Sequence, residues 1–329
     1  MRILVMGGTS FVGRAIVEEA LLRGDDVTLL GRGRTGTQLF PGVARLVGDR
    51  DTGDYAALTA AVAAGADWDA VADVTAYVPR HVTELADALG DHGGRYLFIS
   101  TGSVYDKALA APTAMDEDAP RLAPVRDTEQ VTGETYGGLK VACEDDARAR
   151  FAGRVTVVRP GIVAGPHDVT DRFTYWVRRA ALGGRVAVPA RLDQPVQVVD
   201  SRDLARLVLA LLHDDRSGTF NAVGPAEPVT LADLIQACAE GAGTTVELVA
   251  VDPGGVAQGF PLVLPDASWD ALYRRSAQAA RAVGLTATPL ARTAADTLAW
   301  DRGRGLPALA VDLTAEQESA LLESARQPS

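Results

Sequence analysis

Two residues in this chain of 329 amino acids have the types and the spacing that acid–base chemistry requires. Tyr136 and Lys140 are four positions apart, so on a helix they share one face with their Cβ atoms about 6 Å apart. Tyrosine is a poor base because its ordinary pKa is about 10, and a nearby ammonium group lowers that pKa by stabilising the phenolate. Lysine is rare here, because the chain has two lysines, Lys107 and Lys140, and 30 arginines. Chance therefore predicts only ~0.04 tyrosine–lysine pairs at this spacing. The pair is a candidate general acid/base, the alternative being a surface tyrosine packed on a lysine stem.

A group of hydroxyl side chains follows the apolar run at residues 96–100. Thr101 and Ser103 come directly after this run, which predicts a buried strand. A hydroxyl at the carboxyl end of a parallel strand points into the crevice where ligands bind, and it can donate to a substrate oxygen that gains negative charge. The alternative is a hydroxyl that only satisfies backbone groups.

A glycine-rich turn, GGTSFVG, lies between the first apolar run and an amphipathic stretch. Such a turn from strand to helix directs backbone N–H groups at a pyrophosphate. Glycine is common in this chain, at 33 of 329 residues, so the position of the turn in the first strand–helix unit carries most of the weight. The candidate phosphate contacts in this turn are Gly7, Thr9, Ser10, Phe11, Val12 and Gly13.

Short apolar runs alternate with helical patterns through the first half of the chain. The runs occupy residues 3–6, 27–30, 44–47, 70–74, 96–100 and 155–160. Near-continuous apolar strands separated by helices predict an α/β fold with a doubly wound parallel sheet covered on both faces. We expect this domain to span residues 1–165, with 196–224 returning to it. A smaller C-terminal α/β lobe, formed by 166–195 and 225–329, is expected to bind substrate.

Composition limits the function classes. The net charge is −11, which argues against a nucleic-acid surface. The two cysteines and four histidines lack disulfide or metal-ligand spacing, so we expect no metal site. With no signal peptide at its beginning and no apolar run of spanning length, the chain is expected in the cytoplasm, without a membrane partner.

The motifs resemble those of the extended and atypical short-chain dehydrogenases/reductases, the NAD-dependent epimerase/dehydratase-like family. GGTSFVG is similar to their GGxGFxG or GGTxFxG turn, with Ser10 in place of the middle glycine. The segment after the fifth strand is similar to SSxxVY, and alignment on Val104 and Tyr105 places the catalytic hydroxyl on Thr101 rather than Ser103. Further landmarks imply cofactor contacts at Asp49, Arg50, Thr75, Ala76 and Pro160.

This resemblance implies a Rossmann-type NAD(P)-binding domain and an oxidoreductase that transfers hydride between nicotinamide and a carbonyl or secondary alcohol. Tyr136 is then the general acid/base, Thr101 polarises the substrate oxygen, and Lys140 holds the nicotinamide ribose and tunes Tyr136. A homodimer is implied as well. One alternative is a sugar-nucleotide epimerase or dehydratase. Another is a non-catalytic cofactor-binding sensor or RNA-associated protein.

Cofactor and substrate preference rest on fewer residues. NAD-specific relatives carry an aspartate at the end of the second strand, where this chain has Gly31 and Arg32, so we expect NADP(H), with NAD(H) as the alternative. Nucleotide-sugar relatives carry asparagine and tyrosine where this chain has Ile162 and Ala164, which favours a substrate without a nucleotide. Candidate substrate contacts are Ser103, Val163, His167, Arg172 and Trp176; the last two are equally compatible with a helix whose apolar stripe is core.

Overall fold

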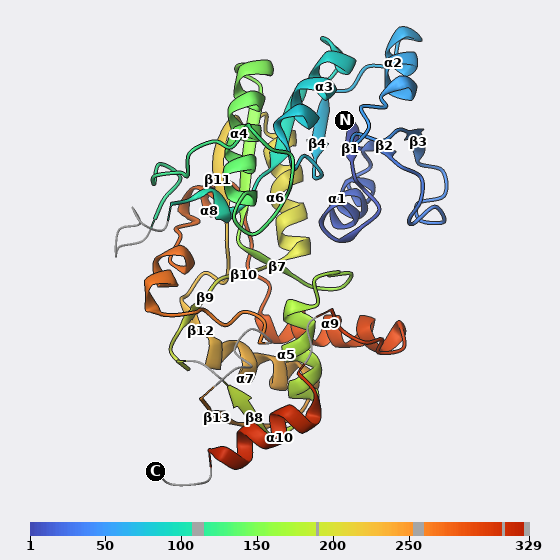
Figure 1. The fold of residues 1–329 in the computed structure, drawn as a ribbon. Coiled ribbons are helices and arrows are strands. Elements are labelled where there is room, and N and C mark those ends of the chain that lie inside the picture. The colour runs from blue at the N-terminus through green and yellow to red at the C-terminus, as the bar shows by residue number, and fades with distance from the viewer. Residues whose placement is uncertain (107–114, 189–190, 253–259, 311–312, 326–329) are drawn as a thin grey trace. The chain divides into compact units, whose positions relative to one another are not determined.

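A computed structural model describes residues 1–106, 115–188, 191–252, 260–310 and 313–325 (Figure 1). The chain forms two compact units. The first unit comprises Met1–Gly161, Arg202–Ala222 and Arg275–Thr286, and the second comprises Ile162–Ser201, Val223–Arg274 and Ala287–Ser329. No helix within the described part of the chain is both long and apolar enough to cross a membrane.

The first unit is built on a seven-stranded parallel sheet in the order β11-β6-β5-β4-β1-β2-β3. The strands are β1 (Arg2–Met6), β2 (Asp26–Gly31), β3 (Ala44–Val47), β4 (Ala70–Asp73), β5 (Arg95–Ile99), β6 (Val155–Pro160) and β11 (Gly218–Ala222). The order runs outward from β1 in both directions, which is the doubly wound arrangement. The predicted Rossmann-type fold and the six predicted strands are confirmed.

Helices cover both faces of this sheet. They are α1 (Phe11–Leu22), α2 (Ala56–Ala63), α3 (Pro79–Leu89), α4 (Tyr136–Arg150), α6 (Ser201–His213) and α8 (Gln278–Ala282), with a short 3-10 helix, η1 (Gly102–Val104). Leu4 and Met6 belong to one apolar cluster with side chains of α2, α3 and α4. Ile3 and Val5 are equally buried. Because alternate residues of a strand point to opposite faces, the second face is covered as well.

The second unit contains three small two-stranded sheets and a group of helices. β7 (Ile162–Ala164) pairs with β10 (Val198–Asp200), β9 (Pro195–Val196) with β12 (Val229–Thr230), and β8 (Gly184–Val188) with β13 (Val246–Ala250). Its helices are α5 (Arg172–Ala181), α7 (Leu231–Ala242), η4 (Ala267–Tyr273), α9 (Leu290–Gly303) and α10 (Ala315–Ser324). A capping box begins α7: Thr230 Oγ1 accepts from the Asp233 backbone at 3.1 Å, and the Asp233 carboxylate accepts from the Thr230 backbone at 2.8 Å.

The unit boundaries differ from the expectation in two places. The run 198–200 was expected in the main sheet, but it forms β10 beside β7, and β11 supplies the seventh strand of the main sheet instead. The return to the first unit is 202–222 rather than 196–224, and Arg275–Thr286 returns as well. A short apolar strand carries no local sign of its partner, because pairing joins segments far apart in sequence.

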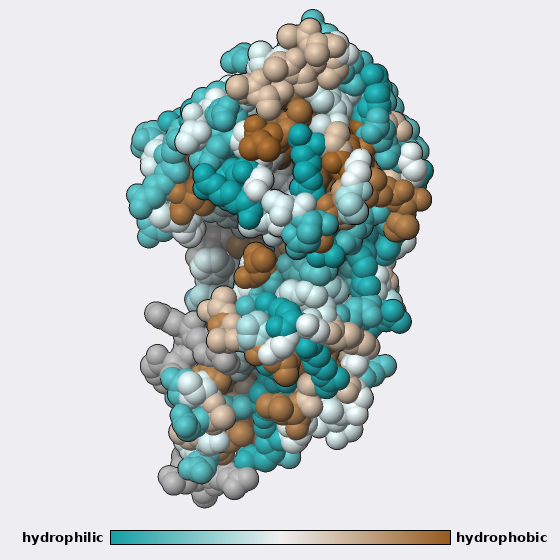
Figure 2. Space-filling model, turned by 90° about the vertical axis from the view of Figure 1, so that its right-hand side faces the viewer, coloured by the Kyte–Doolittle hydropathy of each residue, from teal (hydrophilic) through white to brown (hydrophobic). Residues whose placement is uncertain are grey.

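Figure 2 shows one face of the molecule, where hydrophilic side chains surround small groups of apolar side chains.

Candidate active site

The glycine turn after β1 has the conformation that its sequence predicts. Gly7 has φ +84°, a left-handed conformation that side chains rarely adopt. A Cβ on Gly13 would lie 2.1 Å from the Gly7 carbonyl oxygen, so the first turn of α1 packs directly against the backbone of the loop. The turn therefore packs closely against the beginning of α1, where the backbone N–H groups of a helix can bind an anionic ligand.

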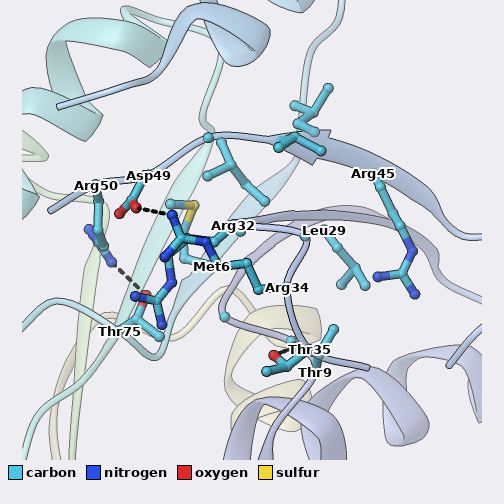
Figure 3. Close-up of a pocket in the computed structure, with 18 of the residues that line it drawn as sticks. Met6, Thr9, Leu29, Arg32, Arg34, Thr35, Arg45, Asp49, Arg50 and Thr75 are labelled. Atoms are coloured by element: carbon cyan, nitrogen blue, oxygen red, sulfur yellow. Dashed lines mark hydrogen bonds and ion pairs between the residues drawn. The ribbon is translucent and has the colours of Figure 1, made fainter. Parts of the chain in front are cut away.

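A cavity of about 420 Å³ opens in front of this turn (Figure 3). Three loops after β1, β2 and β3 form its wall, together with residues after β4. The lining includes Gly7, Gly8, Thr9, Ser10, Gly31, Arg32, Gly33, Arg34, Thr35, Arg45, Asp49, Arg50, Asp51, Thr75 and Tyr77. Its size is within the range of small-molecule sites, and four arginines line it. The glycine cradle and the exposed guanidinium groups of Arg32 and Arg34 fit the phosphates of a dinucleotide.

Arg32 and Arg34 lie at the open side of this cavity. Their side chains are 53% and 71% exposed, and they approach Asp51 and Asp49, respectively, at 3.7 Å. Exposed ion pairs at this distance contribute little to stability. A ligand phosphate could therefore replace either carboxylate at small cost.

Arg50 was predicted to contact the cofactor, and its guanidinium is directed mainly into the protein. It forms a bidentate pair with Asp73 at 2.7 and 2.9 Å and donates to Thr75 Oγ1 at 2.8 Å. Tyr96 also donates to Asp73, at 2.8 Å. Burial raises the pKa of Asp73, but the charge and hydrogen bonds of Arg50 outweigh it, so the pKa lies below the ordinary value. The pair joins the loop after β3 to the last residue of β4.

Thr75 and Ala76, two other predicted cofactor contacts, are held at the end of β4. Thr75 Cγ2 occupies the space beside Gly7, because a Cβ on that glycine would lie 2.1 Å from it. Ala76 is fully buried, and its carbonyl accepts a hydrogen bond from Lys140. The end of β4 therefore connects the phosphate turn with the Tyr–Lys pair.

Tyr136 and Lys140 lie on the first turns of α4, as predicted. Lys140 is only 2% exposed, and its ammonium donates to the carbonyl oxygens of Ala76 and Ile99, both at 2.8 Å. The ammonium also lies 4.1 Å from the centre of the Phe98 ring. Burial lowers the pKa of Lys140 to about 8. A lysine in this state is a proton donor or acceptor close to neutral pH.

Tyr77 links the cavity to the pair, and the sequence analysis did not single it out. It lines the cavity, and its ring centre is 6.4 Å from that of Tyr136 and 5.5 Å from the Lys140 ammonium. Its place directly after Thr75 and Ala76 at the end of β4 was the available signal. Tyr77 thus lies between the cavity, which it lines, and the Tyr–Lys pair within the first unit.

Thr101 begins η1 at the carboxyl end of β5. Its Oγ1 accepts from the Ser103 backbone at 3.1 Å and donates to the Ser103 hydroxyl at 3.3 Å. The first contact satisfies a backbone group, which was the alternative left open. The second is a long bond to an exposed side chain, and donation to a substrate oxygen would replace it, because a hydroxyl group has one hydrogen to donate.

The remaining predicted site residues differ from one another in burial and in the contacts they make. Pro160 is buried as the last residue of β6. In the second unit, Val163 is half-buried on β7. His167 lies edge-on to Trp300 at 5.4 Å, and exposed Arg172 donates to Thr170 at 3.3 Å. Trp176 is fully buried in the apolar core of this unit, and its indole donates to the Pro261 carbonyl at 2.7 Å. The helical stripe is therefore core at Trp176, which corrects the expectation that this side chain contacts substrate.

Comparison with known proteins supports the same family. Residues 3–223 match the NAD dependent epimerase/dehydratase family. A dTDP-6-deoxy-L-talose 4-dehydrogenase (NAD(P)(+)) from Kitasatospora kifunensis is 28% identical over 82% of this chain and 86% of its own length. The chloroplast stem-loop binding protein of 41 kDa b from Arabidopsis thaliana is 26% identical over 74% of this chain, and the match spans 63% of that protein, less than two thirds.

Solved structures share the fold. The UDP-glucuronic acid 4-epimerase from Bacillus cereus, solved in complex with NAD, superposes with a TM-score of 0.67 at 15% identity, covering 92% of this chain and 99% of that one. The match to the family covers all seven strands of the main sheet and the Tyr–Lys pair. The chain therefore belongs to the NAD dependent epimerase/dehydratase family and is an NAD(P)-dependent enzyme of the short-chain dehydrogenase/reductase type.

Proposed function

We propose that this enzyme transfers a hydride between its nicotinamide cofactor and a carbonyl or secondary alcohol carbon of a small molecule, with net oxidation or reduction of that molecule. The observation that carries the proposal is the position of Tyr77, which lines the cavity and lies beside Tyr136 and Lys140. The nicotinamide, when bound, supplies or accepts the hydride.

Three side chains transfer the proton and stabilise the negative charge that develops during the reaction. The Tyr136 hydroxyl gives a proton to the substrate oxygen in reduction and takes one in oxidation. The Lys140 ammonium favours the phenolate form of Tyr136 by its positive charge. The Thr101 hydroxyl donates to the same substrate oxygen as negative charge develops on it.

The cofactor is NADP(H) in this proposal. Gly31 ends β2 without a side chain that would repel a 2′-phosphate, and Arg32, Arg34 and Arg45 line the cavity beside it. Guanidinium groups bind phosphate through charge-assisted hydrogen bonds. NAD(H) is the alternative, since the B. cereus epimerase was solved with NAD.

Replacing Tyr136 by Phe tests the chemistry, because it removes only the titrating oxygen. Turnover should fall by roughly 10²-fold or more, while cofactor affinity stays the same. The assay is oxidation or reduction of the cofactor over a panel of aldehydes, ketones, alcohols and sugar nucleotides, with affinity measured by cofactor fluorescence. Turnover close to wild type in the variant would refute the assignment.

A second candidate is an epimerase or dehydratase that returns the hydride to its own sugar-nucleotide substrate, and the family match favours it. Two residues argue against a substrate that carries a nucleotide, because Ile162 and Ala164 are apolar and buried in the core of the second unit. Calorimetry with dTDP- and UDP-sugars distinguishes the two: micromolar binding with product formation and no net change of the cofactor favours this second candidate.

Assembly and location complete the proposal. We expect a homodimer, as the family resemblance implies, and a cytoplasmic location, as the sequence analysis predicts. Sedimentation of the purified protein tests the oligomeric state. A third candidate is RNA binding, suggested by the name of the Arabidopsis relative. The net charge of −11 opposes it, and gel-shift titration with a stem-loop RNA would detect it.

A further inference from the structure

A third residue continues the helical face that carries Tyr136 and Lys140. Glu144 is one turn further along α4 and is fully buried. Its carboxylate accepts a hydrogen bond from the Ser100 hydroxyl at 2.7 Å and two from the Arg159 guanidinium at 2.9 and 2.7 Å. Ser100 immediately precedes Thr101, so this carboxylate holds the chain at the residue before the catalytic hydroxyl.

The same arginine also holds the other end of this segment. Arg159 is 2% exposed, and it donates to the Tyr105 hydroxyl at 2.9 Å while its guanidinium lies 5.0 Å from the centre of the Tyr105 ring. Tyr105 in turn donates to the side chain of Asn221 at 2.6 Å. Residues 101–104 are thus anchored on both sides, at Ser100 and at Tyr105.

Burial of these charges is costly, and their stability contribution alone gives little reason for them. Burial raises the pKa of Glu144, but the hydrogen bonds and charge of Arg159 outweigh it, so the pKa lies below the ordinary value and the carboxylate stays ionised. Apolar side chains of similar volume often replace a buried ion pair without loss of stability. The ion pair instead fixes the geometry of its neighbours, because each of its hydrogen bonds holds one particular partner in place.

We propose that Glu144 and Arg159 are positioning residues, which hold the Thr101 hydroxyl toward the substrate oxygen that exchanges a proton with Tyr136. The inference rests on the proposed function, in which Thr101 polarises that oxygen. Neither residue contacts the substrate. Their effect passes through Ser100 on one side of the turn and Tyr105 on the other.

Two conservative variants test the proposal while the buried ion pair of Glu144 and Arg159 stays intact. Ser100→Ala and Tyr105→Phe each remove only the hydroxyl group that the network holds. Arg148→Ala is the matched control, because Arg148 donates to the same Glu144 carboxylate at 3.3 Å but has no hydrogen bond to residues 100–105. The substrate is the compound with the highest kcat/KM in the cofactor-coupled panel.

We expect kcat to fall about 10- to 100-fold in Ser100→Ala and Tyr105→Phe, since a small misplacement of a catalytic group has effects of this size. The dissociation constant of the reduced cofactor should stay within about twofold of wild type, and Arg148→Ala should keep wild-type kcat. Hydrogen–deuterium exchange of the peptide covering 100–106 should accelerate in the first two variants only. That readout needs no substrate.

The outcomes separate this inference from the function on which it rests. If Tyr136→Phe loses turnover while Ser100→Ala and Tyr105→Phe keep wild-type kcat, the positioning role is refuted and the proposed function stands. Equal losses in Arg148→Ala, or losses that follow cofactor affinity, also refute it. Wild-type turnover in Tyr136→Phe would refute the proposed function, and the inference with it.

Discussion

The ring of Tyr77 lies with its centre 6.4 Å from that of Tyr136, tilted by 38°. Tyr77 lines the wall of the candidate cofactor cavity, and Tyr136 begins the helix that carries the candidate acid–base pair. The Lys140 ammonium is 5.5 Å from the same Tyr77 ring. One aromatic side chain therefore lies beside both the cavity and the candidate acid–base pair.

This contact predicts different effects for two substitutions of Tyr77. Tyr77→Phe keeps the ring and should change turnover and cofactor affinity by less than about twofold. Tyr77→Ala removes the ring, and an aromatic contact of about 0.5–1.5 kcal/mol corresponds to roughly 2- to 10-fold weaker cofactor binding. Fluorescence titration with the reduced cofactor measures both. Equal affinities in the two variants would mean that the ring has no such role.

Lys140 should titrate far below an ordinary lysine, because burial lowers its pKa to about 8. The chain has only two lysines, so protein labelled with ¹⁵N-lysine gives two side-chain signals, and Lys107→Arg identifies them. The Lys140 signal, which remains in Lys107→Arg, should titrate near pH 8. Between that pH and the ordinary lysine pKa the unfolded state binds more protons, so unfolding free energy should rise with pH by roughly 3 kcal/mol from this group. A Lys140 signal that titrates near pH 10 would contradict the buried environment.

The Arg50–Asp73 pair should make the protein sensitive to acid. The pKa of Asp73 is lowered in the folded state, so its contribution is present above the unfolded pKa, near 4, and is lost as the pH falls through the folded value. Asp73→Asn leaves Arg50 with an uncompensated buried charge and should cost roughly 3 kcal/mol at pH 7. Tyr96→Phe, which removes one bond to the same carboxylate, should cost only about 1 kcal/mol. Urea unfolding at pH 7 and pH 3 tests whether the Asp73→Asn difference shrinks in acid; a constant difference would argue against the pair.

The phosphate turn should not tolerate a side chain at Gly13. A Cβ there would lie 2.1 Å from the Gly7 carbonyl oxygen, so Gly13→Ala must displace the turn and should abolish measurable cofactor binding. Gly133→Ala is the control, because its Cβ would enter open space. Calorimetric titration with NADPH and NADH compares the two, and wild-type affinity in Gly13→Ala would show that the turn does not bind the cofactor.

Arg32 should decide the preference between cofactors. Arg32→Ala removes a donor to the 2′-phosphate and should weaken NADPH binding by ~1.5–3 kcal/mol, about 10- to 150-fold. NADH binding should hardly change. Arg126→Ala serves as control, since Arg126 pairs with Asp146 and does not line the cavity. Equal affinity of the wild type for NADH and NADPH would leave Arg32 without this role.

Local sequence patterns were sufficient to predict much of the fold and of the candidate site. The six strands of the first half, the glycine turn and the helix of Tyr136 and Lys140 depend on apolar periodicity and on spacing within a few residues, which the chain carries directly. The capping box at Thr230 is equally local. For the same reason the fold class and the candidate acid–base pair could be predicted without a structure.

What only the tertiary structure decided depends on contacts between segments distant in sequence. The pairing of β10 with β7, the return of residues 275–286, and the place of Trp176 in the core are of this kind. So are Tyr77 beside Tyr136, and Glu144 between Ser100 and Arg159. A sequence shows which side chains can donate, accept or carry charge, but the partner of each is chosen by packing, because hydrogen bonds and ion pairs form only at distances that the folded chain sets.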